Sequence, residues 1–131
     1  MGHVRRPLPL TVAAICAALA LPAAAQAVYR PFQTPSGQIT CAYYAFTDVA
    51  PQIRCDLLFL NDRAAVITRS GKGRIVKVTD AVGDPKSRKL AYGTSTRFGS
   101  YTCTSRRSGL TCRSRASRHG FTVSRQSQKL F

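Results

Sequence analysis

Only a few residues of this sequence have types that could serve catalysis. His119 stands in the run Arg118-His119-Gly120 and would serve as a general base if Asp56 oriented it towards a nucleophilic serine. No G-x-S-x-G elbow accompanies this histidine, and a packing or turn role fits its surroundings better. Glycoside cleavage needs two acids about one site, but the chain has no glutamate and only scattered aspartates. We therefore predict no catalytic residues.

The cysteines favour disulfides over metal binding. Cys16 lies in an apolar N-terminal run, and the other four cysteines are Cys41, Cys55, Cys103 and Cys112. The two pairs have 13 and 8 intervening residues, unlike the short C-x2-C spacing of zinc sites. If the N-terminal run is removed on export, as its sequence suggests below, Cys16 is removed with it and four cysteines remain. An even number of cysteines in an exported chain argues for two disulfides, and four cysteines allow three pairings. The sequence predicts no metal site and no cofactor.

The remaining chemistry is positive charge. The chain has 20 Lys and Arg against five Asp, and no acidic residue follows Asp84. Arginine binds phosphate and carboxylate through a planar fork of donors, so this excess predicts contacts with polyanions. Phe98 and Tyr101 could join the arginines on one face; alternatively they lie in the core beneath a merely solvated basic surface. The candidate polyanion-binding residues are Arg97, Arg106, Arg107, Arg113, Arg115 and Arg118.

The N-terminal segment has the pattern of a secretory signal peptide. Arg5 and Arg6 precede an apolar run over residues 8–21, and Ala25-Gln26-Ala27 fits an A-x-A cleavage site, with Ala23-Ala24-Ala25 as a second option. The run is shorter than the roughly 20 residues that a membrane-spanning helix needs. We expect residues 1–27 to be removed and residues 28–131 to form one exported domain without a transmembrane segment. Its 18 basic and five acidic residues would give a net charge of +13.

Alternating hydrophobic side chains predict β-strands along the rest of the chain. Residues 39–43 and 53–59 show a period of two, with a loop expected over residues 46–51. A second pair is expected at residues 65–68 and 75–79, joined by a turn at residues 70–73. Residues 28–37 contain two prolines and predict a lead-in, and Phe121 and Val123 predict a last strand that ends near residue 131.

The clearest predicted element is a hairpin over residues 101–113. Its turn, Arg106-Arg107-Ser108-Gly109, has a common hairpin length and places Cys103 opposite Cys112. Cross-strand neighbours lie within disulfide reach, so we pair these two cysteines, which leaves Cys41 with Cys55. The predicted fold class is all-β: a small disulfide-stapled domain built from antiparallel hairpins.

Several short motifs resemble those of a family of small exported bacterial proteins of unknown function. The motifs are Pro35-Ser36-Gly37-Gln38-Ile39-Thr40-Cys41, Ile53-Arg54-Cys55-Asp56, Leu90-Ala91-Tyr92-Gly93, the pattern from Tyr101 through Gly109-Leu110-Thr111-Cys112, and His119-Gly120-Phe121-Thr122-Val123-Ser124-Arg125. The chain departs from the family's pattern at Gln38, Arg118 and Gln128, and it lacks two middle cysteines that relatives commonly carry. The resemblance implies export and a disulfide-rich β fold, but no activity.

These observations predict an exported, non-enzymatic basic module, located in the periplasm or outside the cell. Its expected partner is an anionic polymer of the cell envelope, because an exported protein rarely meets nucleic acid. The alternative partner is an extracytoplasmic protein, which would be bound or inhibited through the loop at residues 106–109. A hydrolase centred on His119 is the third hypothesis.

Overall fold

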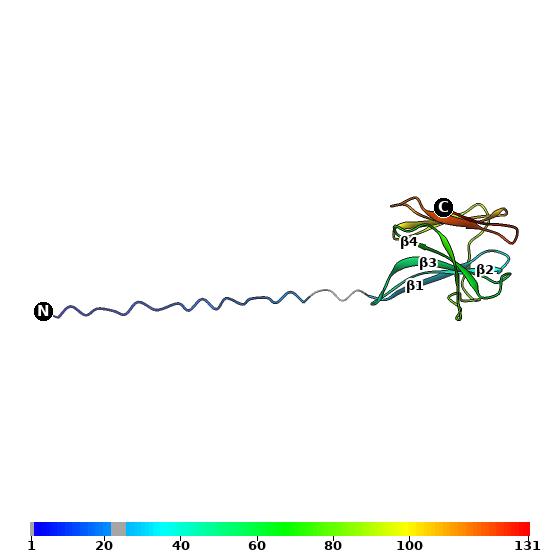
Figure 1. Cartoon of the computed structure of the whole chain (residues 1–131). Helices are drawn as coiled ribbons and strands as arrows, with labels where there is room; N and C mark the ends of the chain where they lie inside the picture. Colours follow the sequence, from blue (N-terminus) through cyan, green and yellow to red (C-terminus); the bar gives the residue numbers. More distant parts are fainter. Residues whose placement is uncertain (1, 22–25) are drawn as a thin grey trace.

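The computed structural model describes residues 2–21 and 26–131 of the chain. Residues 2–21 are exposed, form no helix or strand and lie apart from the sheets (Figure 1). The expected cleavage sites involve Ala23, Ala24 and Ala25, which lie outside the described residues. Within the described ranges, no helix has the length and apolar character needed to cross a membrane.

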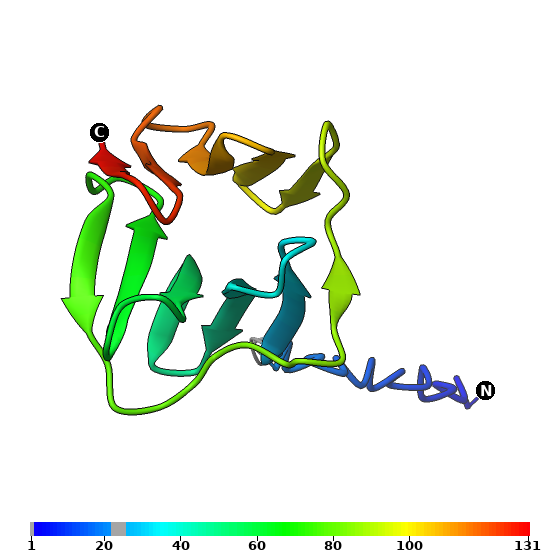
Figure 2. The same ribbon diagram turned by 90° about the vertical axis from the view of Figure 1, so that its right-hand side faces the viewer.

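The described residues form two β-sheets that face each other (Figures 1 and 2). All neighbouring strands are antiparallel except β1 and β6, so the predicted all-β, hairpin-based fold class is confirmed. The six-stranded sheet has the order β5 (Arg74–Lys77), β4 (Arg63–Thr68), β3 (Val49–Leu57), β2 (Ile39–Phe46), β1 (Val28–Gln33), β6 (Arg88–Lys89). The five-stranded sheet has the order β11 (Gln128–Leu130), β10 (Gly120–Val123), β9 (Gly109–Ser114), β8 (Tyr101–Arg106), β7 (Ser95–Phe98).

The core lies between the sheets and contains both disulfides. Because side chains alternate along a strand, every second residue of β8 and β9 points inward and is buried, whereas residues 53–57 of β3 are all buried. Cys41 lies opposite Cys55 on β2 and β3, and Cys103 lies opposite Cys112 on β8 and β9. Both pairs form disulfides, which confirms the predicted pairing. The largest side chains buried around them are Phe32, Ile53, Leu57, Ile67, Tyr101, Leu110 and Phe121.

Backbone contacts close the sandwich along both sides. On one side the turn between β4 and β5 meets the end of the chain, where the Gly73 N–H donates to the Phe131 carbonyl oxygen at 3.1 Å. A Cβ on Gly73 would lie 2.0 Å from the Gly120 carbonyl oxygen, so this approach requires glycine. On the other side, the backbone itself crosses between the sheets after β6 (Figure 2), where the Leu90 N–H extends the pairing of β6 with β1 by donating to the Gln33 carbonyl oxygen at 2.8 Å.

The structure corrects three details of the predicted strands. The lead-in forms β1, which tolerates Pro31 because β6 pairs only with Phe32 and Gln33 and leaves the edge beside the proline open. The loop expected over residues 46–51 is wrong, because β2 and β3 continue pairing as far as Phe46 and Val49. The single last strand is instead the antiparallel pair β10 and β11.

Tyr101 should make the fold sensitive to alkaline pH. The side chain is 1% exposed, and its hydroxyl donates to the Pro51 carbonyl oxygen at 2.6 Å. Burial raises the pKa of Tyr101 to about 12, nearby Tyr43 adds to this rise and Arg69 opposes it. The unfolded tyrosine ionises near pH 10, so its contribution of roughly 2–3 kcal/mol is present below pH 10 and is lost between pH 10 and pH 12.

Urea unfolding at pH 9 and at pH 11.5, with tyrosinate absorbance recorded on the folded protein, measures this loss. Between pH 9 and pH 11.5, the free energy of unfolding of Tyr101→Phe should fall less than that of the parent. Tyr92 is 40% exposed, so Tyr92→Phe should lose as much stability as the parent. Equal alkaline losses in the parent and in Tyr101→Phe would show that Tyr101 is not responsible.

Candidate polyanion-binding surface

The outer face of the five-stranded sheet carries hydroxyl and basic side chains. Along β8 and β9 the inward residues are buried and the alternate residues are more exposed, and strand register extends this outward set to β7, β10 and β11. We call this outward set the basic face. Its members are Ser95, Arg97, Thr102, Thr104, Arg106, Thr111, Arg113, Thr122 and Lys129.

Strand register arranges the basic face in rows. One row crosses all five strands through the successive partners Ser95, Thr104, Thr111, Thr122 and Lys129. Within it the Ser95 and Thr104 side-chain oxygens are 2.7 Å apart, and those of Thr111 and Thr122 are 2.8 Å apart. The result is a row of hydroxyl groups that ends at a lysine.

Basic side chains stand on both sides of the hydroxyl row. On one side lies a second row, in which Thr102 of β8 pairs with Arg97 of β7 and with Arg113 of β9. On the other side lies Arg106, the last residue of β8. The Arg113 guanidinium carbon lies 5.2 Å from the centre of the Phe131 ring, a contact that restrains the arginine. Three of the six predicted arginines, Arg97, Arg106 and Arg113, therefore share one face.

The other three predicted arginines lie in turns. Arg107 belongs to the turn between β8 and β9, where its guanidinium lies 5.1 Å from the centre of the Tyr92 ring. Arg118 lies in the turn between β9 and β10, at the opposite end of β9, and has a φ of 65°. Arg115 donates to the Tyr101 carbonyl oxygen at 2.8 Å and to the Gly99 carbonyl oxygen, so its guanidinium braces the adjacent turn.

Of the two positions considered for Phe98 and Tyr101, the surface and the core, the structure shows the core. Phe98 and Tyr101 are 5% and 1% exposed, and Phe98 stacks on Phe32 with ring centres 5.2 Å apart. Both occupy inward positions of their strands, so they do not interleave with the surface arginines. Sequence reasoning had also left out Lys129 and the hydroxyl row. The alternating threonines of residues 102–104, 111 and 122 are the pattern that would have revealed that row.

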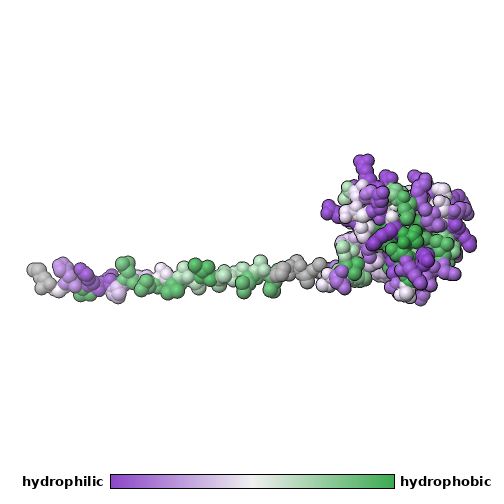
Figure 3. All heavy atoms as spheres, viewed as in Figure 1, coloured by the Kyte–Doolittle hydropathy of each residue, from purple (hydrophilic) through white to green (hydrophobic). Residues whose placement is uncertain are grey.

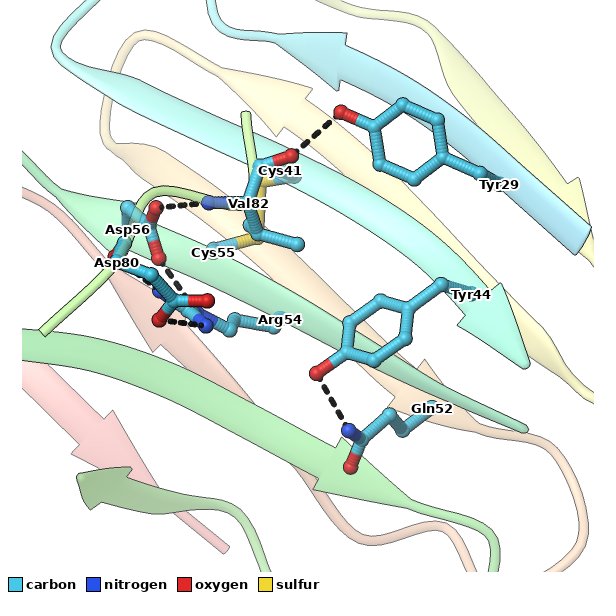
Figure 4. A network of polar contacts seen from close by, with 9 residues as sticks. All are labelled: Tyr29, Cys41, Tyr44, Gln52, Arg54, Cys55, Asp56, Asp80 and Val82. Atoms are coloured by element: carbon cyan, nitrogen blue, oxygen red, sulfur yellow. Dashed lines mark hydrogen bonds and ion pairs between the residues drawn. A yellow bond between two sulfur atoms is a disulfide. The ribbon is translucent and has the colours of Figure 1, made fainter. Parts of the chain in front are cut away.

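A second polar cluster lies on the outer face of the six-stranded sheet (Figure 4). Arg54 is 8% exposed, and its Nε donates to Asp56 Oδ1 at 2.7 Å while its Nη1 donates to Asp80 Oδ1 at 3.0 Å. Burial alone would lower the pKa of Arg54, but the hydrogen bonds to Asp56 and Asp80 outweigh burial and raise that pKa above its ordinary value. This cluster holds the segment that crosses the sheet after β5.

Asp56 is fully engaged within that cluster. Its Oδ1 accepts from Arg54, and its Oδ2 accepts from the Val82 N–H at 2.8 Å (Figure 4). His119 is half-buried at the far end of β9, where its backbone N–H donates to Ser117 Oγ at 3.2 Å. The structure thus does not join Asp56 to His119 as an acid–base pair.

Among residues 2–21 and 26–131, no three His, Cys, Asp or Glu side chains are grouped in a way that could hold a metal ion. The surface of the domain in Figure 3 is largely hydrophilic, with one hydrophobic patch on the face shown. No acidic side chain belongs to β7–β11 or to their connections. Any anion that approaches the basic face therefore meets no carboxylate side chain of that sheet.

The fold and this surface define a small, disulfide-bonded β-sandwich protein with a basic face that carries no acidic side chain. The chain belongs to a family of unknown function, DUF6636, whose family model matches residues 55–131. The matched region includes the whole five-stranded sheet and one partner of the first disulfide, Cys55. Comparisons with curated proteins and with solved structures give no match. The match agrees with the resemblance to a family of unknown function.

Proposed function

We propose that this protein is an exported, non-enzymatic binding protein whose basic face holds an anionic polymer of the cell envelope. The observation that carries the proposal is the hydroxyl row flanked by Arg97, Arg113, Arg106 and Lys129. Neighbouring strands lie about 4.8 Å apart, so a row across five strands extends for roughly 19 Å. A row of that length suits a linear polymer better than a single small anion.

The chemistry of the face matches an acidic polysaccharide or a polyol phosphate. Serine and threonine hydroxyls both donate and accept hydrogen bonds, as sugar and polyol hydroxyls do. Arginine pairs with carboxylate or phosphate through two parallel hydrogen bonds. Since no acidic side chain belongs to this sheet, the basic side chains are not consumed by internal ion pairs.

Export is supported by the leader-like N-terminal segment and by the two disulfides. Disulfides form and persist in the periplasm and outside the cell, and they are rare in the cytosol. In those compartments the accessible polyanions are envelope polymers, so nucleic acid is not the expected partner. We place the protein in the periplasm or outside the cell.

Neutralising three residues of the basic face should release the polymer. In the triple variant Arg97→Gln, Arg113→Gln, Lys129→Gln, we expect binding to the organism's own cell envelope at low salt to weaken by roughly 100-fold or more, since each basic residue contributes about 1 kcal/mol near an anionic surface. The dependence of binding on salt should also flatten, because fewer counterions are released. The exported, oxidised protein is used throughout, across a salt series.

The matched control removes three charges from the other sheet, with Arg30→Gln, Arg74→Gln and Lys77→Gln. These side chains are exposed and lie on β1 and β5. Equal losses in the two triple variants would mean that net charge, and not the basic face, drives retention. Absence of binding by the parent protein at every salt concentration would refute the proposal outright.

A second candidate function is recognition of a protein partner through the turn between β8 and β9. Arg106, Arg107 and Ser108 are all exposed at this turn. Screening weakens charge-driven binding, so one stoichiometric protein that stays bound at high salt would favour this function. Its loss in the variant Arg107→Ala, Ser108→Gly would locate the contact at the turn.

A further inference from the structure

A pocket of about 210 Å³ lies at the end of the sandwich where the turns between β8 and β9 and between β10 and β11 lie together. The segment between β1 and β2 completes its wall. Four motifs that lie far apart in the sequence contribute to this pocket. They supply Ser36 and Gln38 from the motif at residues 35–41, Tyr92 from that at residues 90–93, Leu110 from that at residues 101–112, and Arg125 from that at residues 119–125.

The floor of the pocket is apolar. Ile39, Leu110 and Val123 are buried core residues that reach its base, and Phe59 and Tyr92 add ring surfaces at its sides. The Arg107 guanidinium rests on the Tyr92 ring, so this arginine is held at the wall. An apolar floor of this kind accommodates the C–H face of a ring.

The rim of the pocket is basic and rich in hydrogen-bonding groups. Arg106, Arg107 and Arg125 are exposed around the opening, and no acidic residue lines it. Hydroxyl and amide groups of Ser36, Gln38, Ser124 and Gln126 lie between the arginines. This combination fits a ligand that carries both hydroxyl groups and one anionic group.

The size of the pocket limits the ligand to a single ring. Pockets for drug-sized molecules have volumes of about 300–1,000 Å³, so this pocket accepts something smaller. We infer that the pocket binds one acidic sugar ring, a sugar that carries a carboxylate or a phosphate. Its ring would lie on the apolar floor, and its anionic group would face Arg107 and Arg125.

The pocket also adjoins the basic face, because Arg106 lines both the pocket and the hollow on that face formed with Thr102, Thr104, Thr111 and Arg113. This assignment rests on the proposed function: the acidic sugar ring in the pocket is the end or a side branch of the envelope polymer. The basic face would then bind the polymer chain, and the pocket would select its acidic sugar.

Titration of the oxidised protein with single sugars, followed by heteronuclear NMR, tests the inference. Glucuronate and glucose 6-phosphate should bind and shift the backbone signals of residues 106–110 and 123–126. Neutral glucose and inorganic phosphate should each bind at least about 10-fold more weakly, because glucose lacks the anionic group and phosphate lacks the sugar ring. Equal binding of glucose and glucuronate, or equal binding of phosphate and glucose 6-phosphate, would overturn the inference.

Two variants separate the pocket from the basic face. Arg125→Gln should weaken glucuronate binding about 10-fold or more, as expected for loss of a charge-assisted hydrogen bond. The variant Arg97→Gln, Arg113→Gln should bind glucuronate like the parent, since neither residue lines the pocket. Unchanged glucuronate binding in Arg125→Gln would refute the inference.

The same pair of variants keeps the two proposals apart. If Arg97→Gln, Arg113→Gln retains the envelope polymer fully while Arg125→Gln loses glucuronate, the basic-face proposal fails and the pocket stands. If instead Arg97→Gln, Arg113→Gln loses the envelope polymer while Arg125→Gln still binds glucuronate like the parent, polymer binding by the basic face stands and the pocket assignment fails.

Discussion

Replacing Asp56 with alanine should lower the free energy of unfolding by about 3 kcal/mol. The carboxylate is 5% exposed and accepts from the Arg54 guanidinium and from the Val82 N–H. Removing one partner of a buried ion pair costs about 3–5 kcal/mol, because the other charge remains buried. We expect the lower end of this range, since the Asp80 carboxylate and its carbonyl oxygen still bind Arg54.

The matched control is Asp80→Ala. The Asp80 side chain is 76% exposed, so its ion pair with Arg54 is screened by water and its removal should cost less than about 1 kcal/mol. Urea unfolding of the oxidised proteins at pH 7 measures both variants. A double-mutant cycle with Arg54→Ala should show strong coupling to Asp56 and weak coupling to Asp80. Equal costs for the two aspartates would contradict the assignment of Asp56 as the buried partner.

Removing both disulfides should leave the chain unfolded at 25 °C. Closing the loops between cysteines 14 and 9 residues apart stabilises the fold by about 3 kcal/mol each, slightly less for the shorter loop. Together the two bridges contribute about 5–6 kcal/mol, comparable to the whole stability of a domain of this size. Because all four cysteines are fully buried, alanine at these positions also leaves gaps in the core.

Circular dichroism and one-dimensional NMR of the Cys→Ala variants test this expectation. Cys41→Ala with Cys55→Ala, or Cys103→Ala with Cys112→Ala, should leave a folded but weakened protein. All four substitutions together should abolish the dispersed NMR signals of a packed core. A quadruple variant that keeps native dispersion would show that packing alone holds the two sheets.

Local sequence patterns were enough to predict the hairpins and the disulfides. The hairpin of β8 and β9 could be predicted because alternation and a turn of common length together fix which residues face each other. That register placed Cys103 opposite Cys112, and the remaining pair followed. The sheet arrangement could not be predicted in this way, because contacts such as Gly73 with Phe131 depend on segments far apart in the chain.

The predicted surface residues divide according to whether they lie in strands or in turns. Arg97, Arg106 and Arg113 alternate with buried neighbours on strands, so period-two reasoning places them on one face. Arg107 and Arg118 lie in turns, where side-chain direction depends on turn geometry that the sequence does not specify. Arg115 was predicted as a candidate for polyanion contact, and the structure adds that its guanidinium donates to two backbone carbonyls. The pocket could not be predicted, because its wall combines separate segments of the chain.

The outermost strands of both sheets carry basic side chains. They are Arg74 and Lys77 on β5, Arg88 and Lys89 on β6, Arg97 on β7 and Lys129 on β11. Exposed sheet edges invite pairing with a second molecule, and charged side chains on short edge strands oppose that pairing. These four strands are only two to four residues long. The basic side chains on these strands therefore oppose edge-to-edge pairing between copies of the protein. The shortness of the strands limits such pairing independently of their charge.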